Sequence, residues 1–240
     1  MYKGKNILGV IPARGGSKSF PGKNVSMLCG KPLIAWTIES AKKSGYLDRV
    51  IVSTDDAGIR KVSETHGCEV PFLRPFELAG DRSDIIDAIF HAIDRLKESG
   101  ETYDICMLLQ PTSPLRLPCD IDKSLELMID KGADAVISLC ESEHHPFKCN
   151  TLPDDGCMKD FMRPELKEQN RQSMPVFYRL NGAIYAADIE YLKKLRSFFG
   201  RNTFSYLMPV ERSVDVDRPS DLKIAEALMD QMLHGGFNVI

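Results

Sequence analysis

A basic, glycine-rich segment carries the side chains best suited to binding phosphate. Residues 12–24 read PARGGSKSFPGKN and contain one arginine, Arg14, and two lysines, Lys18 and Lys23. Glycine allows backbone N–H groups to approach a phosphate chain closely, and the three cations neutralise its charge. The glycine spacing matches neither a Walker A loop nor the dinucleotide fingerprint, and Asn24 stands where a Walker A loop requires serine or threonine. We expect residues 12–24, called the phosphate loop below, to bind a polyphosphate; the alternative is a basic surface loop.

Two aspartates near the C-terminal end have the spacing of a metal-binding pair. Residues 214–217 read VDVD. Side chains alternate along an extended chain, so Asp215 and Asp217 point to one side and both valines point to the other. Paired carboxylates beside a polyphosphate are ligands that Mg²⁺ prefers. We call residues 214–217 the carboxylate segment and expect it to hold a divalent cation; the alternative is a half-exposed edge strand with a solvated acidic face.

Two further polar side chains follow short apolar runs. Gln110 lies in LQPTSPLR, where two prolines fix the chain as it leaves a predicted strand, and its amide offers both a donor and an acceptor. Arg74 lies in FLRP and has a fork of N–H groups that suits a base or a carboxylate. On residue type alone, the alternatives are a rigid turn for Gln110 and a surface ion pair for Arg74.

The histidines and cysteines do not form a recognisable metal or nucleophile site. His144 and His145 are adjacent, so in an extended stretch they point opposite ways and make a poor chelate. The seven cysteines include no C-x-x-C pair, which is typical of a reduced, cytoplasmic protein. We therefore expect electrostatic handling of phosphate, without covalent catalysis or a histidine–cysteine metal cluster.

Short apolar runs alternate with amphipathic stretches along most of the chain. Strands are predicted at residues 7–11, 49–53, 104–109 and 133–139, and helices at residues 32–43, 83–98, 120–130 and 220–233. Continuous apolarity in the strands is typical of a sheet covered on both faces. The order predicts an α/β fold with a mostly parallel, twisted sheet and helices on both faces. Ligands of such sheets bind at the carboxyl ends of the strands, where the phosphate loop and Gln110 fall.

The alternation breaks between residues 141 and 180, a stretch that contains four prolines and many polar residues. Forty residues without regular structure are unusual inside a compact domain. We expect a long functional excursion or an oligomerisation element. The length of 240 residues allows one large domain or two small ones.

Composition excludes several classes of protein. Hydrophobic residues make up 43% of the chain and charged residues 27%, which is ordinary for a globular protein. The net charge of −3 argues against a general nucleic-acid or membrane-surface binder, since both depend on excess positive charge. No apolar run approaches the length needed to cross a bilayer. We expect a soluble, intracellular protein.

Taken together, these segments resemble the acylneuraminate cytidylyltransferases, also called CMP-sialic acid synthetases. The motifs that carry the resemblance occur in the family's order over nearly the whole chain. They are IPARGGSKSFPGKN (11–24), STDD (53–56), RPFELAGD (74–81), LQPTSPLR (109–116), EHHPFK (143–148), NGAIY (181–185) and SVDVD (213–217). The set is far more specific than any one motif.

The resemblance implies a Rossmann-like nucleotidyltransferase fold and a defined reaction. CMP would pass from CTP to the anomeric hydroxyl of a nine-carbon 2-keto acid sugar, with release of pyrophosphate and a requirement for Mg²⁺. Residues 1–240 would form a single cytidylyltransferase domain. Residues 141–180, called the arm below, would join two subunits into a homodimer.

The resemblance also assigns roles to individual residues. Catalysis would depend on Arg14, Lys23 and Asp215. The nucleotide would be held by Arg14, Ser17, Lys18, Lys23, Asn24, Arg74 and Ser83, with Arg74 on the cytosine. The acid sugar would face Gln110, Lys148, Arg171 and Asn181. Asp215 and Asp217 would bind the metal.

The chain departs from the family pattern at two places. Ser19 stands where the family usually has glycine, and residues 81–86 read DRSDII instead of a run of small and hydroxyl-bearing residues. Ser83 can contribute to the base pocket through its backbone, whereas Ile85 has no hydroxyl to offer. Two alternatives stay open: transfer of CMP to another acidic sugar, such as the eight-carbon keto acid, and a non-catalytic nucleotide-binding protein on the same fold.

Overall fold

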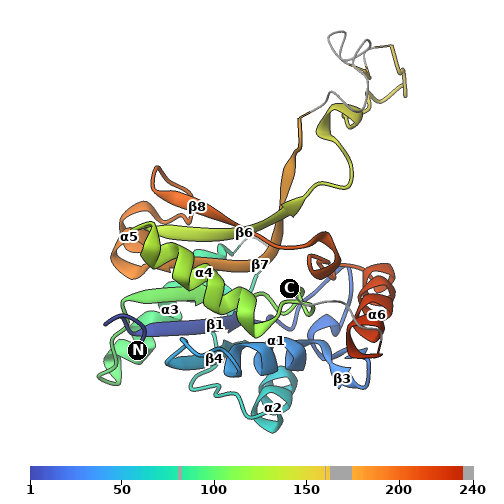
Figure 1. The fold of residues 1–240 in the computed structure, drawn as a ribbon. Coiled ribbons are helices and arrows are strands. Elements are labelled where there is room, and N and C mark those ends of the chain that lie inside the picture. The colour runs from blue at the N-terminus through green and yellow to red at the C-terminus, as the bar shows by residue number, and fades with distance from the viewer. Residues whose placement is uncertain (81–82, 160, 163–174, 235–240) are drawn as a thin grey trace.

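A six-stranded sheet forms the centre of the molecule (Figure 1). The structure is a computed structural model and describes residues 1–80, 83–159, 161–162 and 175–234. The sheet strands are β1 (Ile7–Pro12), β4 (Arg49–Ser53), β5 (Ile105–Leu108), β6 (Ala135–Glu141), β7 (Tyr178–Asp188) and β8 (Thr203–Leu207), and β2 (Met27–Leu28) and β3 (Lys31–Pro32) form a separate hairpin. The helices are α1 (Leu33–Lys42), α2 (Ala57–Thr65), α3 (Ile85–Glu98), α4 (Pro118–Asp130), α5 (Ile189–Leu195) and α6 (Pro219–His234).

The strand order is β4-β1-β5-β7-β6-β8, and β7 alone runs against its neighbours. The prediction of a mostly parallel sheet is therefore confirmed, and the four predicted strands correspond to β1, β4, β5 and β6. Strands β7 and β8 and helices α2 and α5 were not predicted. The antiparallel β7 lies between β5 and β6, so the chain must leave the sheet after β6 and return in the opposite direction.

Helices cover both faces of the sheet, as predicted. Buried side chains of α1, α2 and α4 form one apolar core, and those of α3 and α5 form a second core on the other face. The amphipathic stripe of α3 accounts for its burial, because Ile86, Ile89 and Ile93 recur at helical spacing and are all buried. Helix α6 packs beside the β2–β3 hairpin in a third, smaller core, which contains Val216 of the carboxylate segment.

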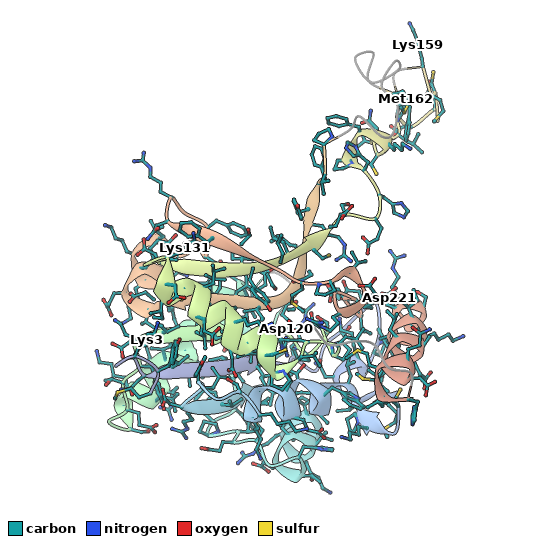
Figure 2. All side chains as sticks on the ribbon, in the orientation of Figure 1. Lys3, Asp120, Lys131, Lys159, Met162 and Asp221 are labelled. Carbon is teal, nitrogen blue, oxygen red and sulfur yellow. The ribbon has the colours of Figure 1, made fainter. Side chains whose placement is uncertain are left out.

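The described residues of the arm, 141–159, 161–162 and 175–180, project away from this body (Figure 1). Strands β6 and β7 stay paired as far as Glu141 and Tyr178, and the Ser142 N–H donates to the carbonyl of Phe177. Figure 2 shows Lys159 and Met162 at the outer end of the projection. The predicted interruption of the strand–helix alternation is therefore present, whereas the proposed role of the arm in dimer formation stays a prediction. None of the helices within the described residues combines the length and apolarity needed to cross a bilayer.

Candidate active site

A cavity of about 390 Å³ opens at the carboxyl ends of β1 and β5. The predicted residues that line it are Arg14, Ser17, Lys18, Lys23, Asn24, Arg74, Gln110 and Asp217. The structure thus brings together the phosphate loop, one member of the carboxylate segment and the glutamine that follows β5. The phosphate loop and Gln110 lie close together because the loops that leave the carboxyl ends of neighbouring parallel strands share one edge of the sheet.

The phosphate loop is held against the loop that follows β4. The backbone N–H of Gly15 donates to Asp55 Oδ1 over 3.0 Å, and a Cβ atom at Gly15 would lie 2.7 Å from Asp56 Oδ2. Asp56 cannot easily retreat, since its other carboxylate oxygen accepts from the Ile59 N–H and caps α2. Glycine at position 15 is therefore required by a close approach. Sequence reasoning missed this role for Asp55 and Asp56, although the STDD motif pointed to the position.

Asn24 closes the phosphate loop on itself. Its Nδ2 donates to the Arg14 carbonyl over 3.0 Å, and the residue is 7% exposed. The bond fixes the backbone of Arg14 while the Arg14 side chain reaches across to the Gly80 carbonyl. These two hydrogen bonds therefore fix the conformation of the phosphate loop without a ligand.

Arg74 is buried at the end of β4. Its Nε donates to Ser53 Oγ over 3.2 Å and its Nη2 donates to the Ser53 carbonyl. Burial lowers the pKa of Arg74 below its usual range. The positive charge of Arg14 lowers this pKa further, whereas the negative charge of Asp55 raises it. The guanidinium is held rigidly where it borders both the main cavity and an adjoining one.

The adjoining cavity, of about 190 Å³, is lined by Arg14, Arg74, Ser83 and Ile85 among others. Ser83 Oγ donates to the Glu77 carbonyl over 2.8 Å, so its hydroxyl already has an acceptor within the chain. Ile85, which borders both cavities, presents an apolar wall. Positions 81 and 82, which belong to the divergent run, lie outside the described residues.

The carboxylate segment lies opposite the phosphate loop. Val216 is fully buried while Asp215 and Asp217 are exposed, so the two carboxylates share one side as the alternation predicted. The segment is not part of any strand, which excludes the edge-strand alternative. Lys23 Nζ lies 2.8 Å from Asp217 Oδ1, and this ion pair joins the two segments across the cavity.

The carboxylate of Asp215 is crowded by protein atoms although the residue as a whole is exposed. This crowding raises its pKa, and the negative charge of Asp217 acts in the same direction. A hydrogen bond from Thr112 and the positive charges of Lys23 and Arg179 act against that shift. A hard divalent cation between Asp215 and Asp217 would relieve the repulsion. Among the residues that the structure describes, no cluster of three or more metal-ligating side chains occurs, so phosphate and water oxygens would complete its coordination.

The predicted sugar-binding residues are not all brought together. Gln110 lines the main cavity, but Lys148 lines a different one of about 720 Å³ at the base of the arm. Asn181 is buried, and both ends of its amide are hydrogen-bonded within the protein. Arg171 lies outside the described residues. The roles of these four residues toward a sugar stay predictions.

The sheet and the basic glycine-rich loop at its carboxyl edge define a nucleotide-binding α/β protein. The chain belongs to the cytidylyltransferase family, whose sequence model matches residues 8–233. Membership agrees with the resemblance found in the sequence, and the same group contains synthetases of three related CMP-sugars.

Three relatives illustrate this group. The chain is 36% identical to the CMP-N,N'-diacetyllegionaminic acid synthase of Legionella pneumophila, over 93% of this chain and 96% of that protein. It is 36% identical to the N-acylneuraminate cytidylyltransferase of Escherichia coli, over 91% of this chain but only 51% of that protein. The chain therefore spans about half the length of that relative. It is 30% identical to the pseudaminic acid cytidylyltransferase of Campylobacter jejuni, over 93% and 96% of the two chains.

Solved structures agree on the fold. A CMP:2-keto-3-deoxy-manno-octonic acid synthetase in complex with CTP superimposes with a TM-score of 0.71 and 20% identity, over 95% of this chain and 99% of that one. A 4-diphosphocytidyl-2C-methyl-D-erythritol synthase from Anaerococcus prevotii gives a TM-score of 0.64 and 16% identity, over 95% and 100% of the two chains. At these identities the likeness concerns the fold, and it confirms the Rossmann-like arrangement predicted from the sequence.

Proposed function

We propose that this protein transfers CMP from CTP to the anomeric hydroxyl of a nine-carbon 2-keto acid sugar, an N-acylneuraminate or a related nonulosonate. Pyrophosphate is the second product, and the activated sugar serves surface glycan synthesis. One observation carries the proposal: Arg14, Lys18, Lys23, Gln110 and Asp217 meet in a single cavity at the carboxyl edge of the sheet. The relatives named for legionaminic, N-acylneuraminic and pseudaminic acids support the nine-carbon class.

The nucleotide half of the reaction depends on positioning and charge. Arg14, Lys18 and Lys23 hold the triphosphate, and Arg14 and Lys23 stabilise the negative charge that grows on its oxygens as the sugar hydroxyl attacks the α-phosphorus in line. Asp215 and Asp217 hold Mg²⁺, which when bound neutralises further phosphate charge. The sugar keeps its own anomeric C–O bond, so the anomeric configuration is retained.

The base occupies the adjoining cavity. Arg74, fixed by Ser53, donates to the cytosine, while Ser17 and Asn24 contact the nucleotide nearer the phosphates. Ser83 contributes through its backbone, because its hydroxyl is bonded to Glu77. Ile85 packs against the nucleotide at the border of the two cavities.

The sugar lies between the main cavity and the arm. Gln110, which follows β5, and Lys148 of the arm contact it, and the sequence resemblance adds Arg171 and Asn181 as further contacts. Lys148 and Gln110 line separate cavities in one chain, and the arm of a second subunit would bring both residues to one site. We therefore propose a homodimer of single-domain subunits joined through the arm and acting in the cytoplasm, where CTP is available.

The sheet offers a surface for that partner. Leu139 of β6 pairs with Leu180 on one side and Leu207 on the other, which places three leucines in a row across the sheet. Leu180 and Leu207 are 47% and 53% exposed. An exposed apolar row at the base of the arm fits an interface between subunits.

Pyrophosphate release from purified protein with Mg²⁺ and CTP tests the proposal. The panel comprises N-acetylneuraminate, a legionaminate, a pseudaminate and the eight-carbon keto acid, with ATP, GTP and UTP in place of CTP as controls. Release with a nine-carbon acid and CTP supports the proposal and names the substrate. Release with the eight-carbon acid alone contradicts it, and no release with any acid or nucleotide points to the non-catalytic alternative.

A further inference from the structure

Asn181 is the centre of a buried polar network. The residue is 1% exposed, and its Oδ1 accepts from Ser138 Oγ over 2.6 Å and from the Ala183 N–H over 3.2 Å. Its Nδ2 donates to Ser213 Oγ over 3.0 Å and contacts Met208 Sδ at 3.3 Å. The oxygen end of the amide is therefore anchored to the sheet, and the nitrogen end is directed at the chain that leads to the carboxylate segment.

Ser213 receives this contact two residues before Asp215. It is fully buried, and its Oγ also donates to the Pro209 carbonyl over 2.7 Å. Its N–H donates to the carbonyl of Val210, and its own carbonyl accepts from Arg179 Nη2 over 3.2 Å. Every polar group of Ser213 is thus used to fix this point of the backbone.

The carboxylate segment is attached outside the sheet: Val216 is buried in the small core beside α6, and Asp217 bonds Lys23, Ser19 and Asp221. The segment pairs with no strand of the sheet. On its far side, the Val216 N–H donates to the Thr112 carbonyl over 2.8 Å, and the Thr112 hydroxyl bonds the Asp215 carboxylate. Asp215 itself therefore lies between two hydrogen-bonded points of the chain, Thr112 after β5 and Ser213, whose hydroxyl accepts from Asn181 of β7.

We propose that Asn181 is a positioning residue: through Ser213 it holds the carboxylate segment where Asp215 and Asp217 can share a cation with the nucleotide phosphates. This inference rests on the proposed function and replaces the direct sugar contact that the sequence resemblance assigned to Asn181. An amide with both ends bonded inside the protein has no group left for a sugar hydroxyl unless one of those bonds is broken. Groups that orient metal ligands through hydrogen bonds have large effects on metal affinity and rate.

Two buried serines provide a matched test. Ser213→Ala removes the hydroxyl that joins Asn181 to the carboxylate segment. Ser138→Ala removes a hydroxyl of equal burial that bonds the opposite end of the same amide and the backbone of Ile184. Each variant loses one buried hydroxyl, so a similar drop in melting temperature is expected for both.

Calorimetric titration with CTP, once with Mg²⁺ and once with EDTA, provides a readout that does not need turnover. For Ser213→Ala we expect the Kd of Mg-CTP to rise about tenfold or more, with the Kd in EDTA unchanged. We also expect kcat to fall by a similar factor while the KM of the acid sugar stays the same. Ser138→Ala should show neither change, because the Ala183 N–H still holds the oxygen end of the amide. If Ser213→Ala does not fold, Ser213→Cys keeps the volume with a poor acceptor and should show the same loss.

Three results would overturn the inference. The first is equal Mg-CTP affinity in Ser213→Ala and the wild type. The second is an equal loss in Ser138→Ala. The third is a raised KM for the acid sugar in Ser213→Ala with unchanged Mg-CTP affinity. That result would favour a direct contact between Asn181 and the sugar. A wild-type protein that binds Mg-CTP but turns over no sugar contradicts the proposed function alone, and the calorimetric comparison still decides the role of Asn181.

Discussion

Lys23 and Asp217 form an ion pair of 2.8 Å although 194 positions separate them in the sequence. The lysine side chain is 12% exposed and the aspartate side chain 64% exposed. The pair joins the phosphate loop to the carboxylate segment, so each charge has an opposite partner before a substrate binds. Entry of a triphosphate with its cation would exchange partners: Lys23 would take the phosphates, and Asp217 would take the cation.

Replacing Lys23 by methionine tests the first half of this exchange. We expect kcat/KM for CTP to fall about 10²- to 10³-fold, the usual effect of removing one donor that faces developing charge. Lys31→Met is the matched control, because Lys31 pairs with Glu39 and lines no part of the main cavity. Steady-state pyrophosphate release measures both variants. An equal effect in the two would show that charge at position 23 has no special role.

Replacing Asp215 by asparagine tests the second half. Turnover should fall by orders of magnitude, because the proposed cation site loses one of its two carboxylates. Folding should not suffer, since the native carboxylate is crowded and repelled by Asp217, as its raised pKa indicates. Thermal melting and a Mg²⁺ titration of the rate check both statements. Near-normal turnover at saturating Mg²⁺ would contradict the metal assignment, and EDTA should abolish activity of the wild type.

The sequence predicted the parts of the site whose signal is local. The strands with continuous apolar runs were found because covered strands need no alternation, and the carboxylate segment was found because alternation alone sets the direction of its side chains. Strand β7 was missed because Arg179, Asn181 and Gly182 interrupt its apolar run. Gly182 has a positive φ of 74° and marks an irregularity in the pairing with β6.

Contacts between residues far apart in the chain could not be predicted from the sequence. Ser138 and Ser213 lie 43 and 32 positions from Asn181, and the neighbouring sequence does not indicate that both serines bond the Asn181 amide. The contact of Asp56 with Gly15 depends likewise on the pairing of β1 with β4. The resemblance to a family supplied candidate roles for such residues, whereas the structure shows which neighbours they have.

The cysteines provide a chemical test of the fold and of the arm. Cys149 and Cys157 of the arm are exposed, whereas Cys68, Cys106 and Cys140 are buried. Burial raises the pKa of Cys68 and of Cys106 to about 12, and the thiolate is the reactive form. Alkylation at pH 9 should therefore leave Cys68 and Cys106 unmodified in the folded protein, while the exposed Cys149 and Cys157 react. Peptide mass spectrometry gives the order, and rapid labelling of Cys106 in the folded protein would contradict the core.

The same labelling tests the proposed homodimer. If the arm joins two subunits, alkylation of Cys149 or Cys157 should slow as the protein concentration rises through the dimer dissociation constant. Cys29, on the β2–β3 hairpin near α6, is the internal control and should label at one rate throughout. Light scattering across the same concentrations measures the mass. Rates independent of concentration at both arm cysteines, with a mass that doubles, would place the interface elsewhere.

Gly15 and Gly16 are neighbours in the phosphate loop, and only Gly16 has room for a side chain. A Cβ at Gly15 would lie 2.7 Å from the Asp56 carboxylate oxygen, whereas a Cβ at Gly16 would meet nothing within 4 Å. Gly15→Ala should therefore push the loop away from Asp55 and Asp56 and raise the KM for CTP about tenfold to a hundredfold, because a displacement near 1 Å is costly at a reacting centre. Gly16→Ala should stay within about twofold of the wild type. Measured KM values for CTP decide the matter, and equal values for the two variants would show that the contact with Asp56 does not set the shape of the loop.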